Sequence, residues 1–203
     1  MSRYTGPRLK VMRALGVDLP GLSRKSISER PNPPGQHGAR PQRKSGFGLQ
    51  LQEKQKLRFN YGLTEHQMRR LVLDARRDRG STGDKLAELL ERRLDNAVFR
   101  SGFAPTVMAA RQLVNHGHVE VNGRAVDIPS YRLRFGDVIT LRERSRKLAA
   151  VQASLAEPAL SRPEWLAFDE AKKLASVAHL PAVSDIPFPI EMQLVVEYYS
   201  QRI

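Results

Sequence analysis

Cationic side chains are the residues of this sequence whose type and grouping best support chemistry. The segment from Pro33 to Gly48 reads PPGQHGARPQRKSGFG, and all of its formally charged side chains are cations. Arginine supplies 25 of the 34 Lys and Arg residues in the chain, and a guanidinium binds phosphate through two hydrogen bonds and stacks on bases. Proline and glycine repeatedly interrupt regular structure here. We therefore predict that this segment either is disordered or becomes ordered only when it binds a partner.

Residues that could support catalysis or metal binding are sparse. RGSTGDK, from Arg79 to Lys85, lacks the spacing of a phosphate-binding glycine loop, and a helix end followed by a new N-cap explains it. His116 and His118 form a pair without a third ligand, so a helix end entering a strand explains them better than a metal does. No Ser, His and Asp group lies in an identifiable nucleophile turn. We expect no enzyme, no cofactor, no metal ion and no small-molecule substrate.

The excess of positive charge favours a polyanionic partner and is unevenly distributed. The formal net charge is +13. Residues 1–50 contain ten cations and two anions, whereas the residues from Glu157 onward contain four cations and seven anions. A solvated surface would interleave the two signs, so the gradient favours contact with a polyanion led by the N-terminal half. We expect the acidic C-terminal part to serve in packing.

The sequence carries no signal for a membrane or for secretion. There is no cysteine for a disulfide or a thiolate zinc site, and no apolar run approaches the ~20 residues of a membrane span. The first residues, MSRYTGPRLKVMRALG, lack the apolar core and cleavage site of a secretory signal. We expect a soluble intracellular protein.

Helical patterns begin at about Gln50 and continue to Gly102, after residues 1–50, which show no sustained period. QLQEKQKLRFNYG predicts a short helix with a basic face, and Thr64 with Gln67 has the spacing of a capping box for the next helix. A third apolar stripe at helical spacing begins near Thr82 and continues to the glycine at 102. These patterns predict a small helical domain.

The pattern changes over residues 103–142. APTVMAARQLVNHG predicts a helix with Thr106 as N-cap and Gly117 as C-cap. HVEVNGRAVDI alternates around Asn122-Gly123, the strongest short signal for a hairpin with a type I′ turn. SYRLRFGDVITL adds a third strand, so residues 93–142 predict two helices followed by a small antiparallel sheet.

The remainder of the chain is harder to interpret. A further helix is expected from Ser145 to Ala156, followed by a proline-rich stretch. The chain closes on MQLVVEYYS, an apolar element that needs a partner to bury it.

Polar side chains on the predicted helix pair have the spacing to contact a folded RNA. In RLDNAVFR, which begins at Arg93, and RQLVNH, which begins at Arg111, they occupy the faces left free by the apolar stripe. The hairpin adds Asn122 and Arg124. Donors at fixed spacing suit an RNA backbone, whose shape can be recognised across the shallow groove. The alternative for this region alone is a solvated basic surface without a partner.

The residues from Arg93 to Leu141 resemble the small RNA-binding module of ribosomal protein S4 of the small subunit. This module occurs in other RNA-handling proteins, so alone it implies only RNA binding. RYTGPRLK, PPGQHGAR, LQEKQKLRFNYG and LVVEYYS also resemble that family, and the resemblance is collinear from Ser2 to Arg202. The chain is identified as a member of the ribosomal S4 family, most similar to its bacterial and plastid forms.

The resemblance implies a primary binder of small-subunit ribosomal RNA. Such proteins bind a multi-helix junction in the 5′ domain and nucleate assembly of the subunit body. The resemblance also implies ribosomal proteins five, three and twelve as partners, a part in decoding accuracy, and a position at the messenger RNA entry channel. It implies a ribosome in the bacterial cytoplasm, with the plastid stroma as the alternative.

The residues expected to contact ribosomal RNA are the cationic and polar side chains of the matched segments. They are Arg3, Arg8, Lys10, Arg13, Gln36, His37, Arg40, Lys54, Lys56, Arg58, Arg69, Arg70, Arg93, Arg111, Gln112, His116, His118, Asn122 and Arg124. By the same resemblance, Arg40, Arg43 and Lys44 match basic positions associated with unwinding messenger RNA at the entry channel.

The family fold implies an α+β protein, in which a small RNA-binding module of two helices plus an antiparallel sheet is inserted into a mostly helical domain. We expect an irregular basic N-terminal extension (1–49), the first part of the helical domain (50–92), the module (93–155) and a C-terminal segment (156–203) that packs back on the helical domain. Some members carry a four-cysteine zinc knuckle near the N-terminus. Here Leu9 and Met12 occupy the first pair of positions, so no metal is expected.

Two other functions use the same module. An RNA-modifying enzyme would need a separate catalytic domain with a nucleophilic aspartate in a strand-rich context. Residues 1–92 are expected to be helical or irregular, and the C-terminal segment is too short for such a domain. A factor that rescues stalled ribosomes would need neither of the terminal matches.

Overall fold

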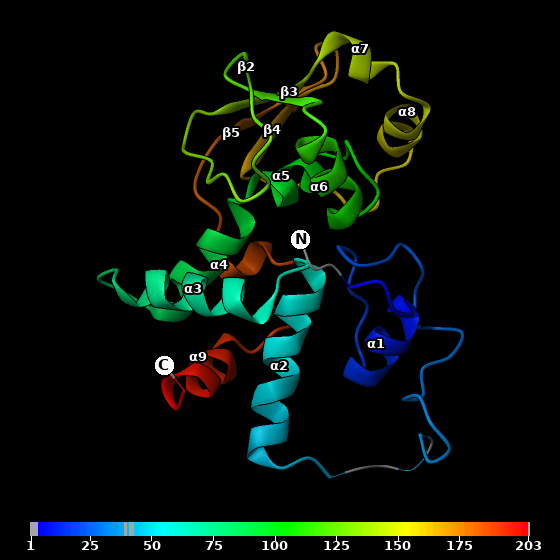
Figure 1. Cartoon of the computed structure of the whole chain (residues 1–203), viewed down its shortest axis with the longest axis vertical. Helices are drawn as coiled ribbons and strands as arrows, with labels where there is room; N and C mark the ends of the chain where they lie inside the picture. Colours follow the sequence, from blue (N-terminus) through cyan, green and yellow to red (C-terminus); the bar gives the residue numbers. More distant parts are fainter. Residues whose placement is uncertain (1–3, 39, 41–42, 203) are drawn as a thin grey trace. The chain divides into compact units, whose positions relative to one another are not determined.

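The computed structural model describes residues 4–38, 40 and 43–202 (Figure 1). Arg3, one of the residues expected to bind RNA, lies outside the described residues. The chain forms two compact units, called unit 1 (residues 1–86 and 186–203) and unit 2 (residues 87–185) below. The boundary after residue 86 falls within helix α4 (Thr82–Glu91).

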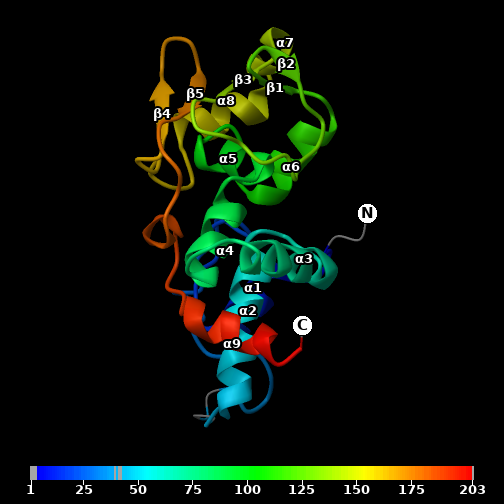
Figure 2. The same cartoon turned by 90° about the vertical axis from the view of Figure 1, so that its left-hand side faces the viewer.

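Unit 1 is helical. Besides the start of α4, it contains α1 (Arg8–Leu15), α2 (Gly46–Asn60), α3 (Glu65–Arg76) and α9 (Met192–Ser200). The C-terminal α9 packs on α2 and contacts α3, so the two ends of the chain share one core (Figure 2). The apolar closing element expected from the sequence is thus a helix with a partner.

Local signals explain where the helices of unit 1 begin. The predicted capping box of α3 is confirmed, because Thr64 Oγ1 accepts from the Gln67 N–H at 3.3 Å and Gln67 Oε1 accepts from the Thr64 N–H at 3.0 Å. Helix α2 begins four residues earlier than expected, because the Ser45 side chain accepts from the Gly48 N–H and caps it.

The N-terminal extension contains a helix that the sequence analysis did not predict. Pro7 precedes α1, and Gly16 ends it in the left-handed conformation with φ of 68°. Met12 and Leu15 are buried, which gives this short helix an inner face. Proline and glycine therefore delimit the helix here, whereas we had treated them as interruptions.

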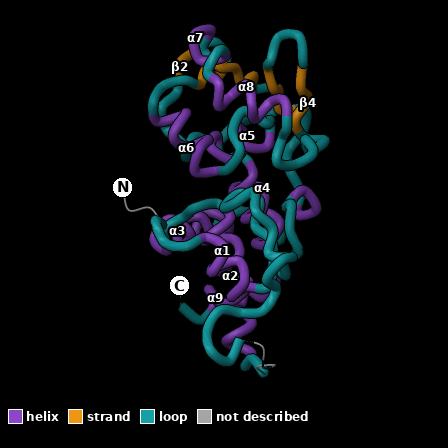
Figure 3. The backbone as a smooth tube through the Cα atoms, turned by 90° about the vertical axis from the view of Figure 1, so that its right-hand side faces the viewer, coloured by secondary structure: helices purple, strands orange, loops and turns teal. Residues whose placement is uncertain are grey.

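Unit 2 contains the end of α4, the helices α5 to α8 and a five-stranded antiparallel sheet (Figure 3). Its helices α5 (Leu94–Arg100) and α6 (Val107–Asn115) pack on each other, and the strand order is β2-β1-β3-β5-β4. The strands are β1 (Val119–Val121), β2 (Arg124–Ala125), β3 (Val138–Leu141), β4 (Leu166–Asp169) and β5 (Leu174–Val177). Between β3 and β4 lie α7 (Glu143–Arg146) and α8 (Ala149–Ala156), and a short 3-10 turn, η1 (Val183–Asp185), follows β5.

One face of the sheet and the two helices enclose the core of unit 2. The strand register places Val121, Ile139, Ala175 and Phe168 side by side in one row across β1, β3, β5 and β4. The first three are buried, and they share a hydrophobic cluster with Leu94 and other residues of α5 and α6. Helices α5 and α6 therefore pack on this face of the sheet, which fixes their position.

The structure differs from the sequence analysis at three places in unit 2. The apolar stripe from Thr82 to Gly102 is two helices, because the chain leaves helical geometry at Arg92 and Arg93. The expected helix from Ser145 to Ala156 is likewise divided into α7 and α8. Strands β4 and β5 were assigned to the segment returning to the helical domain, whereas they extend the sheet of unit 2, and only residues 186–203 belong to unit 1.

The predicted hairpin is present with its type I′ turn. Both turn residues have positive φ, 52° at Asn122 and 74° at Gly123. Val121 pairs with Arg124 across the turn, so the turn fixes which residue faces the core.

Substituting Gly123 with alanine should lower the free energy of unfolding by about 1 kcal/mol, because a Cβ disfavours the left-handed conformation. Urea denaturation of the full chain measures this loss. Gly80→Ala is the matched control, since an added Cβ meets no atom within 4 Å at either glycine and only Gly123 has positive φ. Equal losses at the two positions would contradict the prediction.

Candidate nucleic-acid interface

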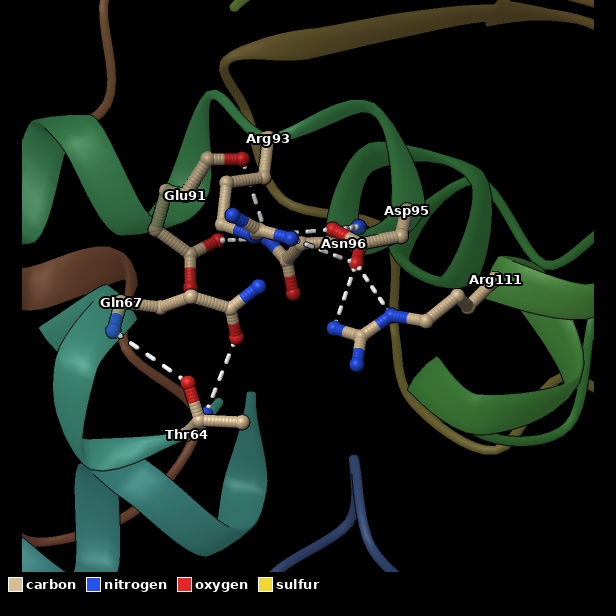
Figure 4. Close-up of polar contacts among 7 residues, drawn as sticks. All are labelled: Thr64, Gln67, Glu91, Arg93, Asp95, Asn96 and Arg111. Carbon is tan, nitrogen blue, oxygen red and sulfur yellow. Dashed lines mark hydrogen bonds and ion pairs between the residues drawn. The ribbon is translucent and has the colours of Figure 1, made fainter. Parts of the chain in front are cut away.

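A buried carboxylate joins the two helices of unit 2. The Asp95 side chain is fully buried and accepts from Arg93, through Nε at 3.0 Å and an Nη at 2.9 Å. It also accepts from Arg111 of α6, through Nε at 2.9 Å and an Nη at 2.7 Å (Figure 4). Two guanidinium groups from separate elements thus meet on one carboxylate, which fixes the start of α5 against α6.

A second buried carboxylate fixes the break between α4 and α5. Glu91 is fully buried, and its backbone and side-chain oxygens both accept from Asn96 Nδ2 at 3.0 Å (Figure 4). The Arg100 guanidinium lies 3.6 Å from the same carboxylate and donates to the Asp185 carbonyl at 2.8 Å. These contacts hold the chain in one conformation at the break, so α5 has one orientation relative to its neighbours in unit 2.

The segment before β3 is bound along this break. Leu94 N–H donates to the Tyr131 carbonyl at 2.9 Å, and Leu133 N–H donates to the Arg92 carbonyl at 2.9 Å. Arg132 forms an isolated bridge with Arg93 in the same stretch. The strand-like pairing carries the exposed side chain of Arg132 alongside the start of α5.

The hairpin is tied to the start of β3 by its own turn residue. Asn122 Nδ2 donates to Asp137 Oδ1 at 2.8 Å, and Asn122 Oδ1 accepts from the Val138 N–H at 2.9 Å. Asp137 also accepts from the Arg134 N–H at 2.7 Å. Both polar atoms of the Asn122 side chain therefore have partners within the protein. Asn122 thus serves to position the neighbouring Arg124.

Unit 2 exposes polar and cationic side chains near the contacts described above, among them Gln112, His116, Arg124, Arg132 and Arg134. A hollow of about 500 Å³ lies between the hairpin and Tyr131, with Arg124 in its lining. Unit 2 therefore combines exposed cations with a concave surface that Arg124 lines, which suits the phosphates and grooves of a folded RNA.

In unit 1, part of the N-terminal cationic charge is used to order the extension itself. Arg8 donates to the Leu22 carbonyl at 3.2 Å, and Arg13 Nε donates to the Asn32 carbonyl at 2.9 Å. The buried Asn60 of α2 accepts from the Gly21 N–H at 2.9 Å. Hydrogen bonds to backbone leave a guanidinium its full positive charge, so these residues can order the extension and still attract an anion.

Several cations of α2 are paired inside unit 1. Lys54 is 3% exposed and contacts the Glu65 carboxylate at 2.7 Å, and Tyr199 of α9 donates to the same carboxylate at 2.8 Å. Burial acts to raise the pKa of Glu65, but the hydrogen bonds from Lys54 and Tyr199 outweigh it and hold the pKa below its usual value. Burial, and then the bond to Glu65, raises the pKa of Tyr199. Lys56 is paired with Glu53 at 2.6 Å.

The structure separates the predicted RNA-binding residues by exposure. Exposed are Arg8, Lys10, Gln36, His37, Arg40, Arg43, Lys44, Arg69, Arg70, Gln112, His116, Asn122 and Arg124. Half-buried are Arg13, Lys56, Arg58, Arg111 and His118, and buried are Lys54 and Arg93. Lys54 and Arg93 have structural roles in buried ion pairs, and the Asn122 amide is bonded to Asp137 and Val138. The other exposed residues of each unit remain predicted RNA contacts.

Other exposed cations of unit 2 were absent from the sequence-based set. They are Arg132, Arg134, Arg142, Arg144, Lys147 and Lys172. The stretch RERSRK after β3 is cationic in the sequence and could have been included from its charge alone. Arg132 could not, because its place beside α5 depends on the long-range pairing with the helix break.

No group of three or more His, Cys, Asp or Glu side chains with ligand geometry occurs among residues 4–38, 40 and 43–202. Within the same ranges, no helix combines the length and the apolar content that crossing a bilayer requires.

Two models of known protein families match the sequence, one over its N-terminal part and one over its middle part. The family model described as ribosomal protein S4/S9 N-terminal domain matches residues 3–91, and the S4 domain model matches residues 92–139. Small ribosomal subunit protein uS4 of Methylobacillus flagellatus is 63% identical over 205 residues, and uS4B of Nitrosomonas europaea is 63% identical over 204. Protein uS4 of Nostoc punctiforme is 54% identical over 203 residues. Each alignment covers 100% of both chains.

Substituting Asp95 with alanine should lower the free energy of unfolding by about 3–5 kcal/mol, because two mostly buried guanidinium groups lose the carboxylate that balances their charge. Urea denaturation followed by circular dichroism measures the loss. Asp127→Ala removes an exposed carboxylate from the same unit and should change stability by less than about 0.5 kcal/mol. A loss at Asp95 no larger than at Asp127 would show that the carboxylate does not hold the helix pair.

Proposed function

The chain belongs to the uS4 family of small ribosomal subunit proteins, and from that premise we propose that its exposed cations bind one folded region of the small-subunit ribosomal RNA. A uS4 protein is a structural, RNA-binding constituent of the small subunit and not an enzyme. What needs a physical account is which residues make the contact and how the fold holds them.

The observation that carries the proposal is the contrast between buried and exposed charge in unit 2. Asp95 and Glu91 are fully buried and balance Arg93, Arg111 and Arg100 inside the unit. The exposed cations stand on the elements that these pairs fix in place. A rigid array of donors can recognise RNA by its shape, because the spacing of phosphates and 2′-hydroxyl groups differs between folded RNAs.

We place the RNA site of the protein at a multi-helix junction of the 5′ domain, where binding would nucleate assembly of the subunit body. Support comes from the rigidity of the helix pair, since a pre-organised surface loses little entropy on binding. The cationic N-terminal extension would add contacts that depend less on RNA shape.

The same proposal gives Arg40, Arg43 and Lys44 a role at the messenger RNA entry channel. All three are exposed, and they precede α2 in a segment with prolines and glycines. Lys44 donates to Gln52, a bond that leaves its charge available. Contacts with ribosomal proteins five, three and twelve, and an effect on decoding accuracy, belong to this proposal through family membership. The high identity to bacterial relatives favours a ribosome in the bacterial cytoplasm over one in the plastid stroma.

Chemical footprinting on naked small-subunit RNA tests the proposed site. We expect protection confined to the 5′ domain junction, because a rigid donor array fits one RNA shape. The matched control is an unrelated transcript of equal length in the same moderate salt, which should show no localised protection. Scattered protection on both RNAs would indicate a nonspecific polycation and overturn the proposal.

The salt dependence of binding tests the individual cations. Arg124→Ala and Arg134→Ala should each reduce the slope of log affinity against log salt by about one, because each removes about one phosphate contact. Filter binding between 50 and 200 mM salt measures the slope. Arg77→Ala is the control, since its side chain is 82% exposed and lies outside the proposed site. Unchanged slopes for both unit 2 variants would remove these residues from the interface.

A further inference from the structure

A hollow of about 250 Å³ lies beside the candidate interface, between α6 and the start of α8. Its inner lining is apolar and includes Phe103, Leu113 and Val151. Polar groups line it as well, from Gln112, His116 and His118. An apolar hollow with a few convergent polar groups is the usual form of a site for a small planar ligand.

The surroundings of this hollow are cationic. The segment from Arg142 to Lys147, reading RERSRK, carries four cations and one anion and leads directly into Leu148 of the lining. Its charge stands near the histidines, because an Arg142 Nη lies 4.0 Å from the position that a Cβ would take on Gly117.

The same segment is anchored to the hollow through His118. The Arg142 N–H donates to the His118 carbonyl at 3.0 Å, and the Ser145 hydroxyl lies 2.9 Å from His118 Nδ1. Arg146 Nε donates to the Leu141 carbonyl at 2.9 Å, which turns α7 back toward the end of β3. Arg142 is thus held next to His118, a residue of the lining, by contacts within unit 2.

We propose that the hollow between α6 and α8 binds a single unpaired nucleobase of the RNA, with the phosphate next to that base held by Arg142 and its cationic neighbours. The inference rests on the proposed RNA-binding function and assigns a base-binding site within it. The apolar lining would cover the faces of the base, and Gln112 with the two histidines would meet its polar edge. Bases displaced from helices are the parts of RNA that proteins bind in this manner.

The charge of the surroundings selects this ligand over an apolar side chain of a neighbouring protein. An apolar side chain would fill the lining but would leave the polar groups of Gln112 and His116 without a use. It would also gain nothing from the cationic segment, whereas a nucleotide uses the lining, the polar groups and the charge together.

Two adjacent alanines of α8 provide a matched test. Ala149 and Ala150 are both exposed in the first turn of the helix, and only Ala150 lines the hollow. Ala150→Phe should fill the hollow and weaken binding of the full chain to small-subunit RNA about tenfold, on the scale that one stacked base contributes. Ala149→Phe adds the same side chain outside the hollow and should leave the affinity unchanged. Equal affinities for the two variants would overturn the proposal.

A titration with mononucleotides tests the site without the ribosomal RNA. The probes are adenosine and uridine 5′-monophosphate, and the readout is the NMR signals of the His116 and His118 rings in the full chain. We expect shifts with at least one nucleotide, and none with ribose 5-phosphate, which has the phosphate but no base. Shifts of equal size with ribose 5-phosphate, or no shift with either nucleotide, would overturn the proposal.

A third probe separates a protein ligand from a base. Shifts with N-acetyl-leucinamide but with neither nucleotide would assign the hollow to an apolar side chain of another protein and overturn the proposal. Failure of the unmodified chain to bind small-subunit RNA would instead contradict the proposed function. The mononucleotide titration still gives its own result in that case, so the two failures can be distinguished.

Discussion

The arrangement of unit 2 depends on one buried carboxylate that accepts from two arginines. Removing charge from water is costly unless each group is paired, so Asp95 can be fully buried only where Arg93 and Arg111 meet it. This requirement fixes α5 against α6 and sets the direction of every side chain that α6 carries. The hollow beside α8 is lined by Gln112 and Leu113 of α6, so its geometry depends on this contact.

The arginines of the protein therefore divide into two functional kinds. Arg93 and Arg100 are 5% exposed and neutralise buried anions, whereas Arg124 and Arg134 are exposed on the elements thus fixed. Each kind requires the other, because an exposed cation recognises shape only if its distance from the next cation is constant. The large excess of arginine over lysine fits both roles, since a planar guanidinium forms paired hydrogen bonds in the interior and at a phosphate.

Much of the fold follows from local patterns, and the rest depends on distant contacts. The capping box of α3 and the turn at Asn122-Gly123 are short-range signals, and both are present as predicted. The break at Arg93 was missed because its cause is pairing with residues near 131 rather than a local breaker. Strands β4 and β5 were missed because each has four residues and depends on pairing: β5 pairs with β3, more than 30 positions earlier, and β4 pairs with β5. For the candidate site, the sequence identified the cationic segments. It could not distinguish Lys54, which is buried and paired in the interior, from Arg124, which is exposed, because that difference appears only in the structure.

The position of α9 has a consequence for how the protein acquires its structure during synthesis. Residues 192–200 pack on α2, which leaves the ribosomal exit tunnel more than a hundred residues earlier. Because synthesis proceeds from the N-terminus, the apolar surface of the first helices stays uncovered until α9 has been synthesised, when translation is nearly finished. Unit 2, whose residues are contiguous, can complete its fold first. A nascent chain could thus display a finished RNA-recognition surface while its first helices still need protection from aggregation.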